Sequence, residues 1–151
     1  MGIRFSPWGH FGSVDPGVSP IPQFSYVITE IEKRALEGKE LAYISLVDPR
    51  ISFDSQQNKI ETHYSTDFVR QIWNGVIIKA SGFNLESAKA ETEKDDKVIV
   101  AFGRDFISNP DLVERFKQNI PLTECDPTTY YTPGPEGYID YPFANEVKPE
   151  A

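Results

Sequence analysis

Two short turns in the sequence have residue types that could hold an anion. One reads ASGF at residues 80–83, and the other reads FGRD at residues 102–105. Small residues let a backbone come close to an anion, and the guanidinium of Arg104 could fork onto phosphate oxygens. The alternative is a surface ion pair of Arg104 with Asp105 or Asp111, and spacing alone does not decide between the two interpretations.

Other residue types that could do chemistry are sparse. Arg4 lies within the apolar run GIRF, where burying a charge is costly unless an anion, a polar ring or a carboxylate pairs with it. The chain has a single cysteine, Cys125, and two histidines that are far apart in the sequence, His10 and His63. These residues predict no zinc site of cysteine and histidine ligands, so we expect no metal.

Four short apolar runs are expected to be the strands that end at these turns. Each run is rich in aliphatic residues and is followed by Pro, Gly or another turn residue, which is typical of strands in a parallel sheet. The predicted strands span residues 2–7, 41–47, 76–80 and 98–102.

A predicted helix follows each predicted strand. The first two have apolar residues at helical spacing, whereas residues 86–93 are helix-forming but poorly amphipathic and are expected on the outside. The first three predicted helices span residues 23–37, 66–73 and 86–93. The last helix is expected to have Asn109 as its N-cap and Pro110 at its first position. Its inward-facing residues are expected to be Leu112, Val113 and Phe116.

The alternation of strand and helix predicts an α/β fold with parallel strands and right-handed crossovers. Four such units fit a small doubly wound sheet, or half of an eight-stranded βα barrel, which usually needs about 250 residues. In both architectures sites form at the carboxyl ends of the strands. Residues 119–151 form an acidic, Pro-rich segment whose aromatic residues are expected to pack: Tyr130, Tyr131, Tyr138, Tyr141 and Phe143.

Length and charge limit the class of protein. The chain has 151 residues, enough for one domain, and 15 basic against 23 acidic side chains give a net charge of −8. Nucleic acid and anionic membranes would repel such a chain, so neither is expected as a partner. No leader pattern follows Met1, and no apolar run reaches the roughly 20 residues of a membrane span, so a cytoplasmic protein is expected.

Several long motifs in register resemble one known family. In chain order they are GIRFSPWG, FSYVITEIEKRALEGKELAYISLVDPR, VIIKASGFN, VAFGRDFISNPDLVERF and GYIDYP. Together they are similar to the C-terminal half of yeast-type old yellow enzymes, which are FMN-dependent NADPH dehydrogenases and ene reductases. The resemblance implies a (βα)8 TIM barrel in which this chain supplies strands five to eight. Residues 1–118 would form this half barrel, and residues 119–151 would pack on it as an extension.

The resemblance also implies residues that bind FMN. Arg4 resembles the arginine that approaches the N1 and C2 carbonyl side of the flavin, where positive charge favours the anionic reduced ring. Ser81-Gly82 and Gly103-Arg104 resemble the backbone and arginine contacts to the FMN phosphate. The relatives have Gly-Asn in place of Ser81-Gly82, so this pair departs from the family pattern.

Aromatic residues are implied on the substrate side. Tyr131 matches an aromatic residue of the family at that side, and Tyr130 lies beside it in the sequence. Phe53 is a looser match to a loop aromatic over the pocket, because the loop of residues 50–64 is a little shorter than in the relatives.

The family activity implied is hydride transfer from NADPH through FMN to an electron-poor alkene. The first half of the family supplies the residues that bind the substrate carbonyl and the tyrosine that protonates the substrate. This sequence has neither, so the chain alone is not expected to be a competent ene reductase, and a complementary N-terminal half or a second copy is expected to complete it. The alternative function is a non-catalytic half barrel that serves as an assembly module, and a free-standing flavodoxin-like domain is disfavoured by the long match.

Overall fold

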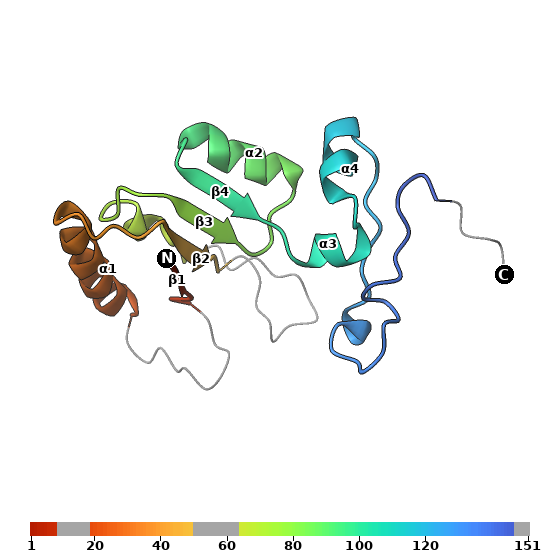
Figure 1. The fold of residues 1–151 in the computed structure, drawn as a ribbon, viewed down its shortest axis with the longest axis horizontal. Helices are drawn as coiled ribbons and strands as arrows, with labels where there is room; N and C mark the ends of the chain where they lie inside the picture. Colours follow the sequence, from red (N-terminus) through yellow and green to blue (C-terminus); the bar gives the residue numbers. More distant parts are fainter. Residues whose placement is uncertain (9–18, 50–63, 147–151) are drawn as a thin grey trace. The chain divides into compact units, whose positions relative to one another are not determined.

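The computed structural model describes residues 1–8, 19–49 and 64–146 (Figure 1). The chain divides into two compact units, Met1–Ala101 and Phe102–Ala151, which we call unit 1 and unit 2. Unit 1 contains the sheet, and unit 2 contains short helices and the C-terminal segment. No helix in the described part of the chain is long and apolar enough to cross a membrane.

A four-stranded parallel sheet forms the centre of unit 1. Its strands are β1 (Gly2–Phe5), β2 (Tyr43–Val47), β3 (Ile77–Ala80) and β4 (Val98–Ala101). They lie in the order β1-β2-β3-β4, and each neighbouring pair is parallel. The predicted parallel α/β sheet is therefore confirmed, with strand ends shifted by one or two residues.

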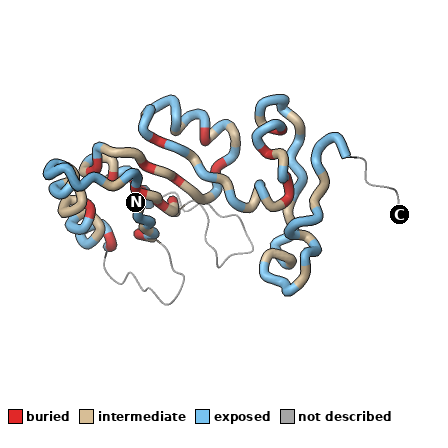
Figure 2. Tube along the Cα trace, viewed as in Figure 1, coloured by how far each residue is buried: buried red, intermediate tan, exposed pale blue. Residues whose placement is uncertain are grey.

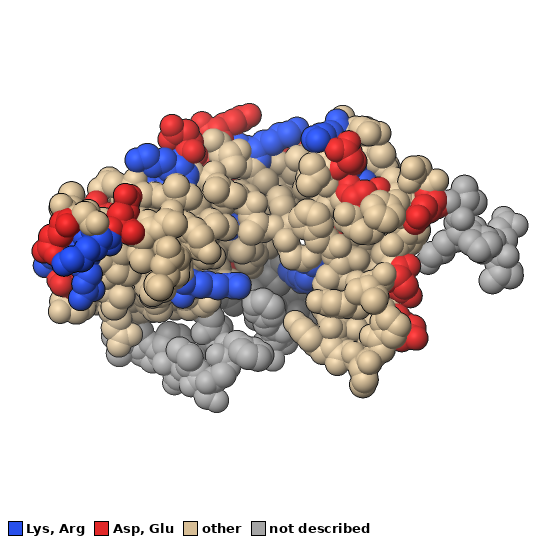
Figure 3. Space-filling model, viewed as in Figure 1, with Lys and Arg blue, Asp and Glu red and all other residues tan. Residues whose placement is uncertain are grey.

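Helix α1 (Ile21–Leu36) connects β1 to β2 and ends as its sequence predicts. Gly38 has a φ of 83°, and its N–H donates to the Ala35 carbonyl at 2.9 Å. The Lys39 N–H donates to the Arg34 carbonyl at 2.9 Å, which completes the glycine-dependent helix end. Acidic and basic side chains intermingle over the outer surface of α1 (Figure 3), which is typical of a solvated helix face.

The predicted helix at residues 66–73 is wrong in type. The structure has a single 3-10 turn, η1 (Asp67–Val69), in this segment. Arg70 donates to the carbonyls of Trp73 and Gly75 at 2.9 Å each, and the Trp73 indole N–H donates to Val76 at 3.1 Å. These side-chain bonds hold the chain in a compact turn before β3. The third predicted helix is confirmed as α2 (Leu85–Lys94).

The core of unit 1 lies on one face of the sheet, where α1 and η1 contribute to it. Burial concentrates on β2 and β3, as Figure 2 shows. The buried cluster consists of Ile28, Ile44, Leu46, Val69, Trp73, Ile77 and Val98. The register places alternate residues on the opposite face, where Arg4, Ser45, Ile78 and Ile99 form one row. Ile99 is 52% exposed, so the described residues of unit 1 do not cover this opposite face.

Unit 2 begins with two short helices, α3 (Arg104–Ser108) and α4 (Leu112–Gln118), and contains the 3-10 turn η2 (Pro127–Thr129). The sequence did not predict α3. The expected N-cap was also wrong, because Asn109 ends α3 and Asp111 is the N-cap residue of α4. Leu112 is buried as expected, whereas Val113 is 52% exposed and does not face inward.

Candidate cofactor and substrate site

Arg4 lies on the sheet face opposite the core. Its neighbour Phe5 pairs in register with the buried Leu46 and packs edge-to-face on Phe24 of α1, with ring centroids 5.5 Å apart. Arg4 therefore points to the other face, level with Ser45. It is exposed and forms no ion pair with a described residue, so its charge is available to an anionic ligand.

The turn after β3 has an unusual backbone. Ser81 has a φ of 99° and Gly82 a φ of 65°, so two successive residues occupy the region that side chains rarely adopt. Neither backbone N–H donates to another described residue. Successive N–H groups in a left-handed turn form concavities that bind anions, so the turn has the geometry expected of a phosphate contact.

Both ends of this turn are held firmly. Before it, the Asp48 N–H donates to the Ala80 carbonyl at 2.9 Å. After it, Phe83 is buried, and Asn84 caps α2 by accepting from the Ser87 N–H at 2.9 Å. Strain in the turn is therefore maintained by the structure on both sides, a pattern that is common at ligand sites.

A network of charged side chains that the sequence did not predict lies near the carboxyl ends of β2 and β3. Lys79 of β3 pairs with Glu91 of α2 at 2.8 Å and with Asp67 of η1 at 3.1 Å. Thr66 donates to the buried Asp48 at the end of β2. Burial acts to lower the pKa of Lys79, but its hydrogen bonds to the two carboxylates and the Asp48 charge raise it above its ordinary value. The network links α2 and η1 to β3, the strand that directly precedes Ser81.

The second predicted phosphate contact lies in unit 2. A Cβ on Gly103 would meet nothing within 4 Å, so the backbone there is open to a ligand. Arg104 forms no ion pair with any described residue, and Asp111 pairs instead with Arg115 at 2.7 Å. Burial raises the pKa of Asp105, and the nearby Arg104 charge opposes that rise without forming an ion pair. The alternative interpretation, a surface ion pair of Arg104 with Asp105 or Asp111, is therefore not found in the described structure.

The two tyrosines that the resemblance implies on the substrate side, Tyr130 and Tyr131, lie together in unit 2. Their rings are edge-to-face with centroids 6.2 Å apart; Tyr131 is 93% exposed, whereas Tyr130 is half-buried. The Tyr130 hydroxyl contacts the Sγ atom of Cys125. Burial and this contact raise the pKa of Tyr130 well above its ordinary value, while the positive charge of Arg104 opposes the rise.

The predicted residues thus fall into two groups. Unit 1 brings Arg4, Ser81 and Gly82 to the carboxyl ends of its strands, and unit 2 places Arg104 close enough to Tyr130 for its charge to act on the phenol. Phe53 lies outside the described residues. Among described residues no group of three His, Cys, Asp or Glu side chains could hold a metal ion.

Comparison with curated proteins gives relatives of known class. The chain is 41% identical over 151 residues to enoate reductase 1 of Kluyveromyces lactis, a match that covers 96% of this chain and 38% of the relative. It is 41% identical over 122 residues to a putative NADPH dehydrogenase of Schizosaccharomyces pombe, covering 80% of this chain and 31% of that protein. The chain therefore spans about a third of the length of these relatives.

Solved structures agree with these relatives. The old yellow enzyme of Pichia sp. AKU4542 matches with a TM-score of 0.76 and 34% identity, over 97% of this chain and 36% of that one. The old yellow enzyme of Trypanosoma cruzi matches with a TM-score of 0.74 and 35% identity, over 95% of this chain and 35% of that one. Old yellow enzymes are TIM barrels, so the barrel interpretation of the βα units is confirmed over the doubly wound one.

A family model matches residues 1–123, which include Arg4, Ser81, Gly82, Gly103 and Arg104. Members of this family and its old yellow enzyme relatives use FMN as cofactor and NADPH as reductant. The resemblance seen in the motifs of the sequence is confirmed by this match. The chain belongs to the NADH:flavin oxidoreductase / NADH oxidase family.

Proposed function

We propose that this chain supplies the FMN-phosphate and substrate-side parts of an old-yellow-enzyme-like ene reductase. When bound, FMN would accept a hydride from NADPH and deliver it to an electron-poor alkene. The observation that carries the proposal is the strained Ser81-Gly82 turn, whose N–H groups have no partner among described residues. The names of the relatives, enoate reductase and NADPH dehydrogenase, support the same reaction class.

The residues present fit the cofactor. In this proposal the Ser81-Gly82 backbone and the Arg104 guanidinium bind the phosphate, and Gly103 leaves room for it. Arg4 carries a charge that no described residue neutralises, and it would stabilise negative charge on the N1 and C2 side of the flavin. Tyr131 and Tyr130 would form part of the substrate wall, and we extend the same role to Phe53.

Two features of unit 1 support the proposal that further barrel strands complete its sheet. Among described residues, β1 and β4 each have one unpaired edge, and the sheet face bearing Ile78 and Ile99 is uncovered. Parallel sheets are normally covered on both faces, and open strand edges invite pairing. We propose that the complementary first part of such an enzyme, or failing that a second copy, provides this cover, and that the complex works in the cytoplasm.

The proposal is tested by complementation. The chain is co-expressed with the part of the Kluyveromyces lactis relative that its match leaves uncovered. We expect the two parts to co-purify with bound flavin and to oxidise NADPH in the presence of an activated enone, while each part alone is inactive. Co-purification without flavin would instead indicate a non-catalytic assembly module.

A further inference from the structure

We infer that Arg115 and Asn109 are positioning residues that hold the loop of residues 124–141 at both ends. The loop carries Tyr130 and Tyr131, so these two side chains would set where the tyrosines lie. A consequence for substrate binding rests in addition on the proposed function.

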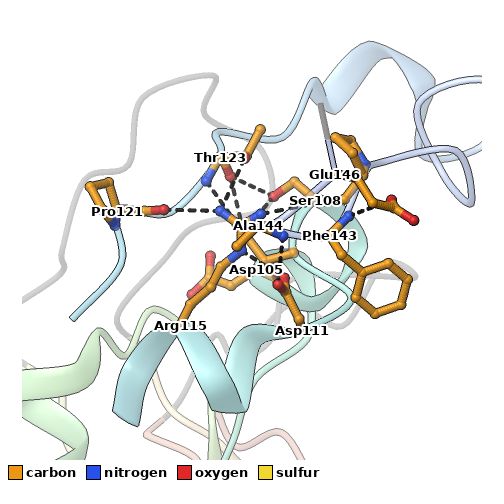
Figure 4. A network of polar contacts seen from close by, with 11 residues as sticks. Asp105, Ser108, Asp111, Arg115, Pro121, Thr123, Phe143, Ala144 and Glu146 are labelled. Atoms are coloured by element: carbon orange, nitrogen blue, oxygen red, sulfur yellow. Dashed lines mark hydrogen bonds and ion pairs between the residues drawn. The ribbon is translucent and has the colours of Figure 1, made fainter. Parts of the chain in front are cut away.

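Arg115 binds the chain on both sides of the loop (Figure 4). It is 5% exposed, and its Nε atom donates to Asp111 Oδ1 at 2.7 Å. Its Nη1 atom donates to the carbonyl of Pro121 at 3.0 Å and to Thr123 Oγ1 at 3.4 Å, just before the loop. Its Nη2 atom donates to the carbonyl of Pro142 at 3.4 Å, just after it. One guanidinium therefore joins the two ends.

Asp111 strengthens the same attachment. Its Oδ2 atom accepts from the Ala144 N–H at 2.7 Å, while Oδ1 is occupied by Arg115. The hydrogen bond from Arg115, followed by that from the Ala144 N–H, holds the pKa of Asp111 below its usual value. The carboxylate thus stays ionised and keeps both partners.

Asn109 fixes the start of the loop independently. Its side chain is fully buried, accepts from the Thr123 N–H at 2.7 Å and donates to the Thr123 carbonyl at 3.0 Å. Ser108 donates to the same carbonyl at 2.7 Å. Both backbone groups of Thr123 are therefore satisfied by the buried side chains of Asn109 and Ser108, which lie between α3 and α4.

Between these ends the loop packs on itself. The Asp126 N–H donates to the Tyr141 hydroxyl at 3.1 Å, and Thr129 Oγ1 donates to the Gly137 carbonyl at 3.0 Å. Gly137 has a φ of 70°, and a Cβ there would lie 2.4 Å from Thr129 Oγ1. The segments around Thr129 and Gly137 are therefore in close contact. Compact surface loops of this kind are packed by their own side chains, and their place depends on how their ends are attached.

Tyr131 has few contacts that hold its side chain in place. It is 93% exposed, and its only aromatic contact among described residues is Tyr130. Tyr130 in turn contacts Cys125 within the same loop. The position of this pair therefore follows the position of the loop, which the Arg115 and Asn109 bonds determine.

The chain offers an internal reporter, because Cys125 is its only cysteine. The experiment measures the rate at which an aromatic disulfide reagent labels Cys125, together with the phenol titration followed by ultraviolet absorbance. In Arg115→Ala we expect labelling to accelerate by about tenfold or more, because the loop opens locally. One tyrosine should also titrate at lower pH, because opening the loop removes the burial and the Cys125 contact that raise the pKa of Tyr130.

A matched control separates loop release from general destabilisation. Arg70 lies in unit 1, donates to the carbonyls of Trp73 and Gly75, and is 2.6 Å from Asp95, so its bonding closely resembles that of Arg115. Arg70→Ala should leave the Cys125 rate and the phenol titration unchanged. Arg115→Lys keeps the positive charge opposite Asp111 but loses the guanidinium group that binds both ends of the loop at once, so it should still accelerate labelling. Equal acceleration in Arg70→Ala, or none in Arg115→Ala, would overturn the inference.

If Arg115→Ala does not fold, Asp111→Asn provides the second test. This variant preserves the shape of the side chain but removes its charge, so it should accelerate Cys125 labelling in the same direction and by less. Unchanged labelling in a folded Asp111→Asn protein would again overturn the inference. These readouts need neither FMN nor a completed barrel, so they are independent of the proposed function.

The role toward substrate is tested in the complemented enzyme. There, Arg115→Lys should raise the KM for the enone by about threefold to tenfold, while the rate of flavin reduction by NADPH stays unchanged. A displaced loop with an unchanged KM would show that the anchors position the tyrosines without serving substrate binding, and would overturn this step alone.

Discussion

The buried Lys79 and the partly buried Glu91 form an ion pair of 2.8 Å that joins β3 to α2, close to the turn at Ser81. The two side chains are 9% and 14% exposed. A buried lysine in the centre of a sheet is stable only with partners, and Lys79 has Glu91 on one side and Asp67 on the other. The pair therefore links the stability of unit 1 to the geometry of the proposed phosphate turn.

The first prediction removes this lysine. Lys79→Met retains the length of the side chain but leaves the Glu91 carboxylate with only the exposed Lys94 at 3.0 Å. We expect unit 1 to lose about 2–4 kcal/mol of unfolding free energy, because breaking a buried pair leaves one charge uncompensated. Urea unfolding followed by tryptophan fluorescence measures the loss, because Trp8 and Trp73 both lie in unit 1. As a control, Lys33→Met removes the exposed pair with Glu30 and should change the unfolding free energy much less than Lys79→Met.

The second prediction concerns acid. Burial acts to raise the pKa of Glu91, but the hydrogen bonds from Lys79 and Lys94 lower it below its ordinary value. A carboxyl whose pKa is depressed in the folded state adds stability above its unfolded pKa of about 4.3, and this stability is lost as the pH falls through the folded value. The unfolding free energy should thus fall below about pH 4 in the natural chain. An equally steep fall in Lys79→Met would contradict this assignment.

Much of the sheet was predictable because its signals are local. An apolar run of a few residues that ends in Pro or Gly indicates a strand, and Gly38 indicates the end of α1 by its own conformation. The errors occur where distant residues decide the structure. Asn109 has the residue type of an N-cap, but Thr123, 14 positions later, binds its side chain instead.

The candidate site likewise has features that the local sequence predicts and features that depend on distant residues. The Ser81-Gly82 turn was predictable because small residues follow an apolar strand. The contact of Cys125 with Tyr130, and the closeness of Arg104 to that phenol, come from the folding of a long irregular segment. No periodicity in the sequence reports such contacts, so they could be found only in the structure.

The third prediction tests strain in the turn. Ser81 has a φ of 99°, which costs a non-glycine residue about 1–2 kcal/mol, whereas added glycine costs about 0.5–1 kcal/mol through the entropy of the unfolded chain. Ser81→Gly should therefore stabilise unit 1 by about 0.5–1 kcal/mol, measured by urea unfolding. Gly82→Ala should destabilise it, since the φ of 65° becomes unfavourable. Gly103→Ala is the control, because a Cβ there meets open space at an ordinary φ of −116°, and a comparable loss in this variant would contradict the explanation by strain.

The last prediction concerns Arg104 and the phosphate of FMN. In the complemented enzyme, Arg104→Ala should weaken FMN by about 1.5–3 kcal/mol, a roughly 10- to 150-fold rise in Kd, because it removes charge-assisted hydrogen bonds. Riboflavin has the same ring without the phosphate, so its affinity should change by much less. Arg34→Ala removes an exposed arginine of α1 and should alter neither affinity. Fluorescence quenching of each flavin on titration with protein measures both constants. An equal loss for FMN and riboflavin would place Arg104 at the ring rather than the phosphate, and an unchanged FMN affinity would remove it from the cofactor site.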